Sequence, residues 1–280
     1  MSGDLGSLKI GITSAHYTAA HGFAEGLRRI RADGYECIDY SEFVNTETPR
    51  FGCSDAEFDA IVEKERKFIE SLGLEISQTH APWRWPAQDA TPEDRRERFE
   101  KMSRAIRGTA VLGCRNFVIH PIMPWGRFDT DAGVTWAINL DFMSRLCRVA
   151  EECQVTVCLE NMPMRHQSLV TPEHCLRLVR EVGAGNFKIC LDTGHCTMHG
   201  VNPGDAVRML GRDMLAALHV HDNDGETDRH WYPYSGVIDW RDFGAALGEI
   251  GFEGTLSLEV TAVPGREQEL YESALRLAGR

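Results

Sequence analysis

The sequence predicts an α/β protein folded as a single (β/α)8 barrel over residues 1–280, with its functional site at the C-terminal ends of the strands. Eight short apolar segments alternate with amphipathic ones, six of the apolar segments end in a polar side chain, and the longest irregular segments all follow predicted strands. Barrels of this kind commonly occupy about 250 residues as one domain, so this chain length suits a single unit.

The predicted strands are apolar runs, as expected for parallel strands that are buried on both faces. Parallel strands joined by helices leave two architectures open, a closed barrel and an open doubly wound sheet. Eight β/α units favour closure, and no GxGxxG or Walker pattern follows the first strand to indicate a nucleotide-binding open sheet. The strands are expected at 8–13, 35–40, 74–80, 116–121, 155–160, 187–192, 215–221 and 254–260.

Between these strands the sequence contains signals for the start of helices. Ser54 and Glu57 form a capping box before an amphipathic run that Gly73 ends. Three more helices are predicted where a capping side chain precedes a proline at the first helical position, at Thr91-Pro92, Thr171-Pro172 and Asn202-Pro203. The irregular segments that follow strands, and that we expect around the site, are 41–54, 81–91, 121–131 and 222–238.

Composition limits the class of protein. The net charge of −12 argues against nucleic acid as a partner, because such binding draws on Lys and Arg meeting phosphates. No apolar run approaches the roughly 20 residues that span a bilayer, and the N-terminal residues lack the layout of a secretory signal. Nine scattered cysteines without CxxC spacing fit a reducing compartment. We therefore expect a cytoplasmic protein without a membrane partner, and a homo-oligomer stays open.

Six predicted strands end in a side chain that can bind a metal or move a proton. Because the C-terminal ends of parallel barrel strands open onto one mouth, we expect these side chains to converge. Each alone has a plain alternative, a solvated carboxylate or a histidine satisfied within the core, but six corresponding strand ends indicate a metalloenzyme. They are His80, His120, Glu160, Asp192, His219 and Glu259.

Glu160, Asp192, His219 and Glu259 come from four consecutive predicted strands. Neighbouring strands lie about 4.8 Å apart, so their ends can converge on one ion. Three carboxylates and one imidazole suit Mn²⁺, Mg²⁺ or Co²⁺ and tolerate Zn²⁺. We expect one divalent metal, with Mn²⁺ as the first choice.

Three residues of the later loops are further candidates. His195 could orient a substrate hydroxyl or bind a further metal. Asp228 and His230 would lie on the same side of an extended segment, although a solvated loop with a surface ion pair is the alternative. His221 alternates with His219 and should also face the barrel interior, behind the metal ligands or against substrate.

Aromatic side chains crowd the same loops. Trp83 and Trp125 could wall a pocket, since indole rings around a few polar groups commonly hold small ligands such as sugars. The alternative is that these rings pack the long loops onto the barrel rim.

The motifs resemble those of the xylose-isomerase-like TIM barrels, which include sugar isomerases and epimerases, inosose dehydratases and DNA-repair enzymes of the endonuclease IV type. The resemblance is carried by LENMP at Glu160, LDTGH at Asp192, HVHDND…DRH from His219 to His230 and LEV at Glu259. It implies that the matching Glu, Asp, His and Glu bind one divalent metal. It also likens Arg165 to a polar substrate contact of the epimerases.

The resemblance leaves two activities to weigh. All nine metal-ligand candidates, now including His80, His120, His195, Asp228 and His230, also resemble the ligands of the trinuclear zinc cluster of endonuclease IV. Three features argue against a nuclease. The HVHDNDG…D.H motif is closer to that of the sugar isomerases, and the loop from His219 to Asp228 is shorter than in the repair enzymes. The segment SEFVNTETPR, which follows the second predicted strand, is not basic.

The leading hypothesis is therefore a metal-dependent isomerase or epimerase of a keto sugar or related small carbohydrate, working through an enediolate. Glu160 and Glu259 would act as acid and base, while His80, His120 and His195 hold substrate hydroxyls. A multinuclear-zinc phosphodiesterase, an inosose-dehydratase-like lyase and a barrel that binds a sugar or partner subunit without turnover are the alternatives.

Overall fold

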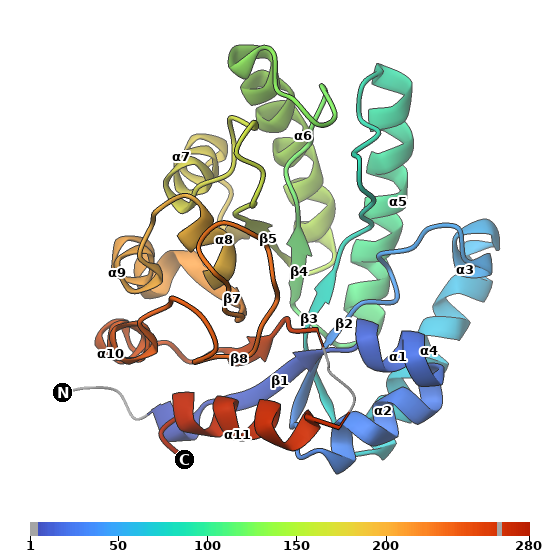
Figure 1. The fold of residues 1–280 in the computed structure, drawn as a ribbon. Helices are drawn as coiled ribbons and strands as arrows, with labels where there is room; N and C mark the ends of the chain where they lie inside the picture. Colours follow the sequence, from blue (N-terminus) through green and yellow to red (C-terminus); the bar gives the residue numbers. More distant parts are fainter. Residues whose placement is uncertain (1–4, 262–264) are drawn as a thin grey trace.

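The computed structural model describes residues 5–261 and 265–280, and it confirms the eight-stranded parallel barrel. The strands gather at the centre and the helices surround them (Figure 1). Along the sheet the order is β7-β6-β5-β4-β3-β2-β1-β8, so consecutive strands are neighbours. The strands are β1 (Lys9–Thr13), β2 (Cys37–Tyr40), β3 (Glu75–His80), β4 (Asn116–Ile119), β5 (Thr156–Glu160), β6 (Phe187–Asp192), β7 (Leu215–His219) and β8 (Thr255–Leu258).

The predicted helix starts are also confirmed. The Ser54 hydroxyl accepts from the Glu57 N–H and the Glu57 carboxylate accepts from the Ser54 N–H, which completes the capping box of α4. Thr91, Thr171 and Asn202 cap α5, α7 and α9 ahead of proline. The helices are α1 (Ala15–His21), α2 (Phe23–Ala32), α3 (Pro49–Gly52), α4 (Asp55–Ser71), α5 (Pro92–Val111), α6 (Ala132–Glu152), α7 (Pro172–Val182), α8 (Thr193–Met198), α9 (Pro203–Met214), α10 (Trp240–Ile250) and α11 (Glu267–Leu277), after a short 3-10 turn at Leu5–Ser7.

Three strands, β4, β7 and β8, end earlier than the sequence predicts, and each ends at the site; β8 stops at Leu258 rather than 260. β4 stops at Ile119 rather than 121, where Pro121 has no N–H to donate to a ladder. β7 stops at His219, because Val220 turns to pair with Leu258 of β8 instead of β6. That single bridge closes the ring and brings the ends of β7 and β8 together.

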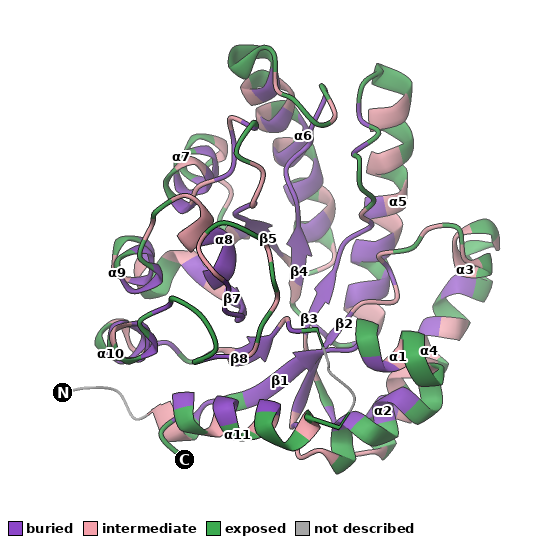
Figure 2. Ribbon diagram, viewed as in Figure 1, coloured by how far each residue is buried: buried purple, intermediate pink, exposed green. Residues whose placement is uncertain are grey.

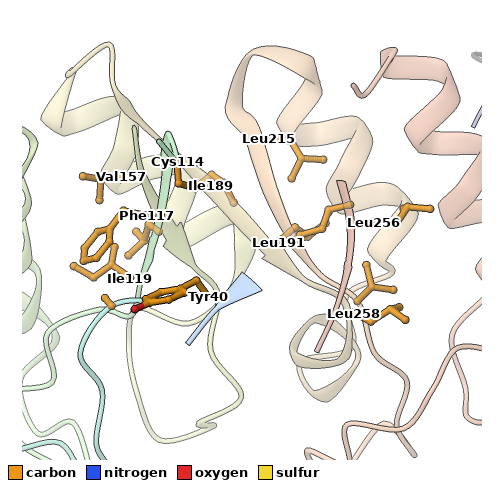
Figure 3. Packing of buried hydrophobic residues seen from close by; sticks show 14 of the residues in the cluster. Tyr40, Cys114, Phe117, Ile119, Val157, Ile189, Leu191, Leu215, Leu256 and Leu258 are labelled. Atoms are coloured by element: carbon orange, nitrogen blue, oxygen red, sulfur yellow. The ribbon is translucent and has the colours of Figure 1, made fainter. Parts of the chain in front are cut away.

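Successive side chains along each strand point alternately toward the surrounding helices and into the barrel interior. Phe117, Ile119 and Val157 belong to the large core between sheet and helices (Figure 3). The strands are mostly buried, whereas the helices expose their outer faces (Figure 2). The barrel interior holds a separate layer of small side chains, made of Val118, Cys158, Cys190 and Ala217.

This interior layer lies directly beneath the candidate site. His120, Glu160, Asp192 and His219 each follow an interior residue by two positions, and a strand returns to the same face every second residue. The site is therefore the next layer of the barrel interior. Among the described residues, no helix is long and apolar enough to cross a membrane.

Candidate metal centre

The structure brings the six predicted strand-end residues together at the mouth of the barrel. His80, Glu160, Asp192 and His219 are the last residues of β3, β5, β6 and β7. His120 and Glu259 directly follow β4 and β8. All six lie at the C-terminal ends of parallel strands, so the chain needs no distortion for their side chains to converge.

Glu160, Asp192, His219 and Glu259 form the predicted four-residue group. One donor atom from each lies within 4.8 Å of the others. His219 Nδ1 is 2.9 Å from Glu160 Oε1 and 3.2 Å from Glu259 Oε2. Glu160, Asp192 and His219 are buried, whereas the Glu259 side chain keeps 22% of its surface exposed. Glu259 is thus the most exposed member of the group.

His219 is held from behind by a residue that sequence reasoning missed. Asp39, on β2, places Oδ2 2.9 Å from His219 Nε2. The Gln78 side chain donates to the same oxygen over 3.0 Å. A metal-binding histidine usually gives its second ring N–H to such a carboxylate, which fixes the ring and leaves the other nitrogen for the metal. The available signal was a charged residue inside the otherwise apolar strand that ends at Tyr40.

The charges of this group are strongly coupled. Burial would raise the pKa of Glu160, but His219 and His120 hold that pKa well below its ordinary value. Burial would lower the pKa of His219, yet the neighbouring Cys190, Glu160 and Glu259 hold it well above. Burial raises the pKa of Glu259. Without a metal, a protonated His219 therefore neutralises Glu160, and a metal would have to displace that proton.

Glu160 also belongs to a second group, with His80 and His120. His120 Nε2 lies 2.9 Å from Glu160 Oε2, and His80 Nε2 lies 3.7 Å from the same atom. Burial lowers the pKa of His120 to about 4, so this ring is neutral at physiological pH. The His80 ring lies parallel to that of His219, with centroids 5.7 Å apart. The two groups share one carboxylate.

A third group joins His195, His221, Asp228 and His230. Asp228 Oδ2 lies 3.3 Å from His195 Nε2 and 3.2 Å from His230 Nε2. Burial opposes protonation of both rings, but for His195 the nearby Asp192 and Asp228 outweigh it and raise the pKa to about 10. Asp228 similarly raises the pKa of His230 to about 10. His195 and His230 are thus cations that flank a carboxylate.

His221 is fully buried in this third group. Its Nε2 lies 3.0 Å from Asp192 Oδ2, and its ring stacks on His230 with centroids 4.2 Å apart. The structure places His221 behind Asp192 rather than in the opening.

The donor set fits a divalent metal. Within the described part of the chain, the buried Asp228 Oδ1 has no hydrogen-bond partner, and Glu160 Oε2 has His120 Nε2 2.9 Å away but forms no hydrogen bond of good geometry. A buried carboxylate oxygen without a partner is costly, and a cation satisfies it. Imidazole and carboxylate donors at these separations suit Mn²⁺, Co²⁺ or Zn²⁺.

A pocket of about 230 Å³ opens above the metal-ligand candidates, and we call it the metal pocket. Trp83 forms part of its wall and meets the His120 ring edge to face, with centroids 4.2 Å apart. The lining consists of Thr13, Ala15, Ser41, Val44, His80, Trp83, His120, Glu160, Met162, Pro163, Met164, His195, Asp228, His230 and Glu259.

Besides His221, two predicted substrate contacts lie outside this lining. Trp125 is 41% exposed, and its indole N–H donates to the Asp131 carbonyl over 3.4 Å. The exposed Arg165 donates to the carbonyls of Met198 and Gly225 over 3.2 and 3.3 Å, so it ties the end of α8 to the loop after β7. Roles for Trp125 and Arg165 in substrate binding stay predictions.

The profile of one protein family, described as xylose isomerase-like TIM barrels, matches residues 27–278. The chain belongs to this family. Its membership confirms the resemblance that the LENMP and LDTGH motifs carry.

Two curated relatives and one solved structure illustrate the xylose isomerase-like family. An uncharacterized protein of Methanocaldococcus jannaschii is 31% identical over 64% of this chain and 62% of its own length. D-psicose 3-epimerase of Enterocloster bolteae is 33% identical over 44% of this chain, and the match spans 39% of that enzyme. The matches thus span less than two thirds of either relative. The IOLI protein, solved with a binding zinc atom, superposes with a TM-score of 0.73 at 17% identity over 97% of this chain and 95% of its own.

Proposed function

We propose that this protein is a divalent-metal-dependent epimerase or isomerase of a keto sugar or related small carbohydrate. The observation that carries the proposal is that Glu160 and Glu259 both reach His219 Nδ1, at 2.9 and 3.2 Å, where the metal pocket opens. The relationship to D-psicose 3-epimerase, an enzyme of sugar epimerisation by its name, supports it. So does the zinc atom of the similar IOLI protein.

Glu160, Asp192, His219 and Glu259 would hold the ion, for which Mn²⁺ is our first choice and Zn²⁺, Mg²⁺ and Co²⁺ are alternatives. When bound, the ion supplies positive charge beside adjacent carbonyl and hydroxyl oxygens of the sugar, which acidifies the neighbouring C–H. Only one ion is needed for this chemistry.

The two glutamates would move the proton. They arrive from β5 and β8, which are not neighbours in the barrel, so they can address opposite sides of a substrate carbon. One carboxylate removes the C–H proton to give an enediolate, and the other returns a proton to the opposite face. Because epimerisation is reversible, each glutamate serves as base for one epimer and as acid for the other.

The remaining pocket residues would bind the sugar. His80, His120 and His195 line the metal pocket and would hold hydroxyl groups. Trp83 would cover an apolar face of the ring.

A second candidate, a multinuclear-zinc phosphodiesterase, is favoured by one observation, the division of the candidate ligands into three groups, two of which share Glu160. The surroundings oppose it. Arg50 is the one basic residue of the loop after β2, and its guanidinium is engaged by Tyr40 and Glu65 rather than free for phosphate. The net charge of −12 points the same way.

Metal content and proton exchange together test the proposal. The chain is stripped of metal, reloaded with Mn²⁺ or Zn²⁺, counted by elemental analysis and incubated with a panel of ketoses in D₂O. We expect one ion per chain and metal-dependent deuterium incorporation at one carbon beside the carbonyl. Three zinc ions per chain with nicking of abasic DNA and no exchange would establish the nuclease instead. Loss of water from an inosose would establish the lyase.

The role of Asp39 gives a first prediction. Asp39→Asn should weaken binding of the metal by about 10–100-fold, because the carboxylate behind a histidine ligand orients the ring and raises its basicity. Calorimetric titration of the metal-free chain measures this change without relying on turnover. Asp59→Asn, on the exposed face of α4, is the matched control and should leave the affinity unchanged. Equal affinities in the two variants would show that Asp39 serves only the fold.

A further inference from the structure

A second cavity lies beside the metal pocket. It measures about 160 Å³, and we call it the side pocket. Val44 and Trp83 line both cavities, and the Trp83 N–H donates to the Val44 carbonyl over 3.1 Å. The two residues therefore belong to the lining of both cavities, which adjoin one another there. Through Trp83 and His120, the side pocket lies two side-chain contacts from Glu160.

The base of the side pocket is rigid and buried. Asp89 is 2% exposed and forms an ion pair with Arg98. The Asp89 carboxylate also accepts the Met123 N–H over 3.0 Å, and Arg98 lies against the Trp83 ring at 5.9 Å. These contacts join the loops after β3 and β4 to α5. Asp89 and Arg98 therefore hold the base of the cavity together.

The charges on the lining disfavour an anionic occupant. The lining contains more acidic than basic side chains: Glu47, Asp89, Asp94 and Glu97 are acidic, and Arg84 and Arg98 are basic. Asp94 completes the capping box of α5, Glu97 pairs with Lys101 at 2.6 Å, and Asp89 is neutralised by Arg98. A phosphate would meet an excess of carboxylates, whereas a neutral group would not be repelled by them.

Uncommitted polar groups and an indole complete the lining. Within the described ranges, neither the Thr46 hydroxyl nor the Gln88 amide has a hydrogen-bond partner in the chain. The Trp83 ring offers an apolar face beside them. Hydroxyl-bearing rings combine polar edges with apolar faces, and such a lining suits them.

We propose that the side pocket is a subsite for a neutral, hydroxylated substituent, such as a glycosyl group, on the keto sugar that reacts in the metal pocket. This rests on the proposed function. Small-molecule sites commonly measure about 300–1,000 Å³. The metal pocket at about 230 Å³ falls short of that range, and the side pocket brings the combined space within it. The substrate is then a glycosylated ketose rather than a free one.

The test compares three sugars that differ at one hydroxyl. Fructose is unsubstituted, palatinose carries a glucosyl group on the terminal hydroxyl, and fructose 6-phosphate carries a phosphate there. On the metal-loaded full chain, calorimetry should give palatinose an affinity about tenfold above that of fructose, as one or two added hydrogen bonds supply. Fructose 6-phosphate should gain nothing.

Two filling variants locate the effect. Gln88→Trp and Thr46→Trp enter the side pocket from opposite loops and should each remove the advantage of palatinose while the affinity for fructose stays unchanged. Gln268→Trp, at an exposed position of α11, is the matched control and should keep the advantage. Palatinose bound no better than fructose, or an advantage that survives both filling variants, would overturn the subsite. A preference for palatinose without deuterium exchange into any ketose would refute the proposed function and leave the subsite standing.

Discussion

Replacing Glu259 with Gln is expected to stop interconversion of the two epimers. It should also abolish deuterium exchange from the epimer whose C–H faces Glu259, because the amide cannot take a proton from carbon. A positioned acid or base contributes about 10²–10⁴-fold, so the rate should fall at least that far. Proton NMR of each epimer incubated separately in D₂O measures both quantities.

Metal content decides how the Glu259→Gln result is interpreted. Gln keeps an oxygen donor, and Glu160, Asp192 and His219 remain. We therefore expect the variant to retain its ion, and excess metal should not rescue exchange. Glu173→Gln, on the exposed face of α7, is the matched control and should behave as the unaltered chain. Unchanged exchange in a metal-loaded Glu259→Gln variant would remove Glu259 from proton transfer.

Glu160→Gln should have a larger effect, since Glu160 is the one residue shared by the four-residue group and the group of His80 and His120. Loss of a supporting carboxylate alone costs about 10–100-fold in metal affinity, so loss of a direct, buried ligand should cost more than 100-fold. Exchange should vanish from both epimers. Elemental analysis after dialysis and D₂O exchange provide the two measurements.

Folding must be separated from metal loss in the Glu160→Gln variant. In the metal-free protein Glu160 neutralises His219, so the variant removes a buried counterion as well as a ligand. Circular dichroism of the metal-free forms shows whether the barrel persists. A folded Glu160→Gln chain that keeps its full complement of metal would contradict the assignment of Glu160 as a ligand.

The barrel was predictable because several local signals agreed. Apolar runs, the Ser54 capping box and the threonine-proline starts at Thr91 and Thr171 each name an element, and eight β/α units leave little choice of topology. The ends of the strands were less predictable. Apolar composition continues past His219, whereas the pairing with β6 does not, since Val220 pairs with β8 instead.

The site was predictable only in part, for a related reason. Parallel strands bring all their C-terminal ends to one mouth, so Glu160 and Asp192 could be grouped from sequence position alone. Asp39 lies one residue before the end of β2, and its importance depends on contact with His219, which is 180 residues away in the chain. The long side chain of Arg165 likewise finds partners that no local pattern specifies.

The small interior layer beneath the site ties strand register to ligand placement. Val118, Cys158, Cys190 and Ala217 occupy the inward positions two residues before His120, Glu160, Asp192 and His219. Slipping any of these strands by one residue would exchange its two faces and turn its ligand toward the surrounding helices. An ion can therefore bind with all of its ligands only when the strands that carry them are paired in the correct register. Metal uptake thus becomes a measure of correct assembly in any redesigned version of this barrel.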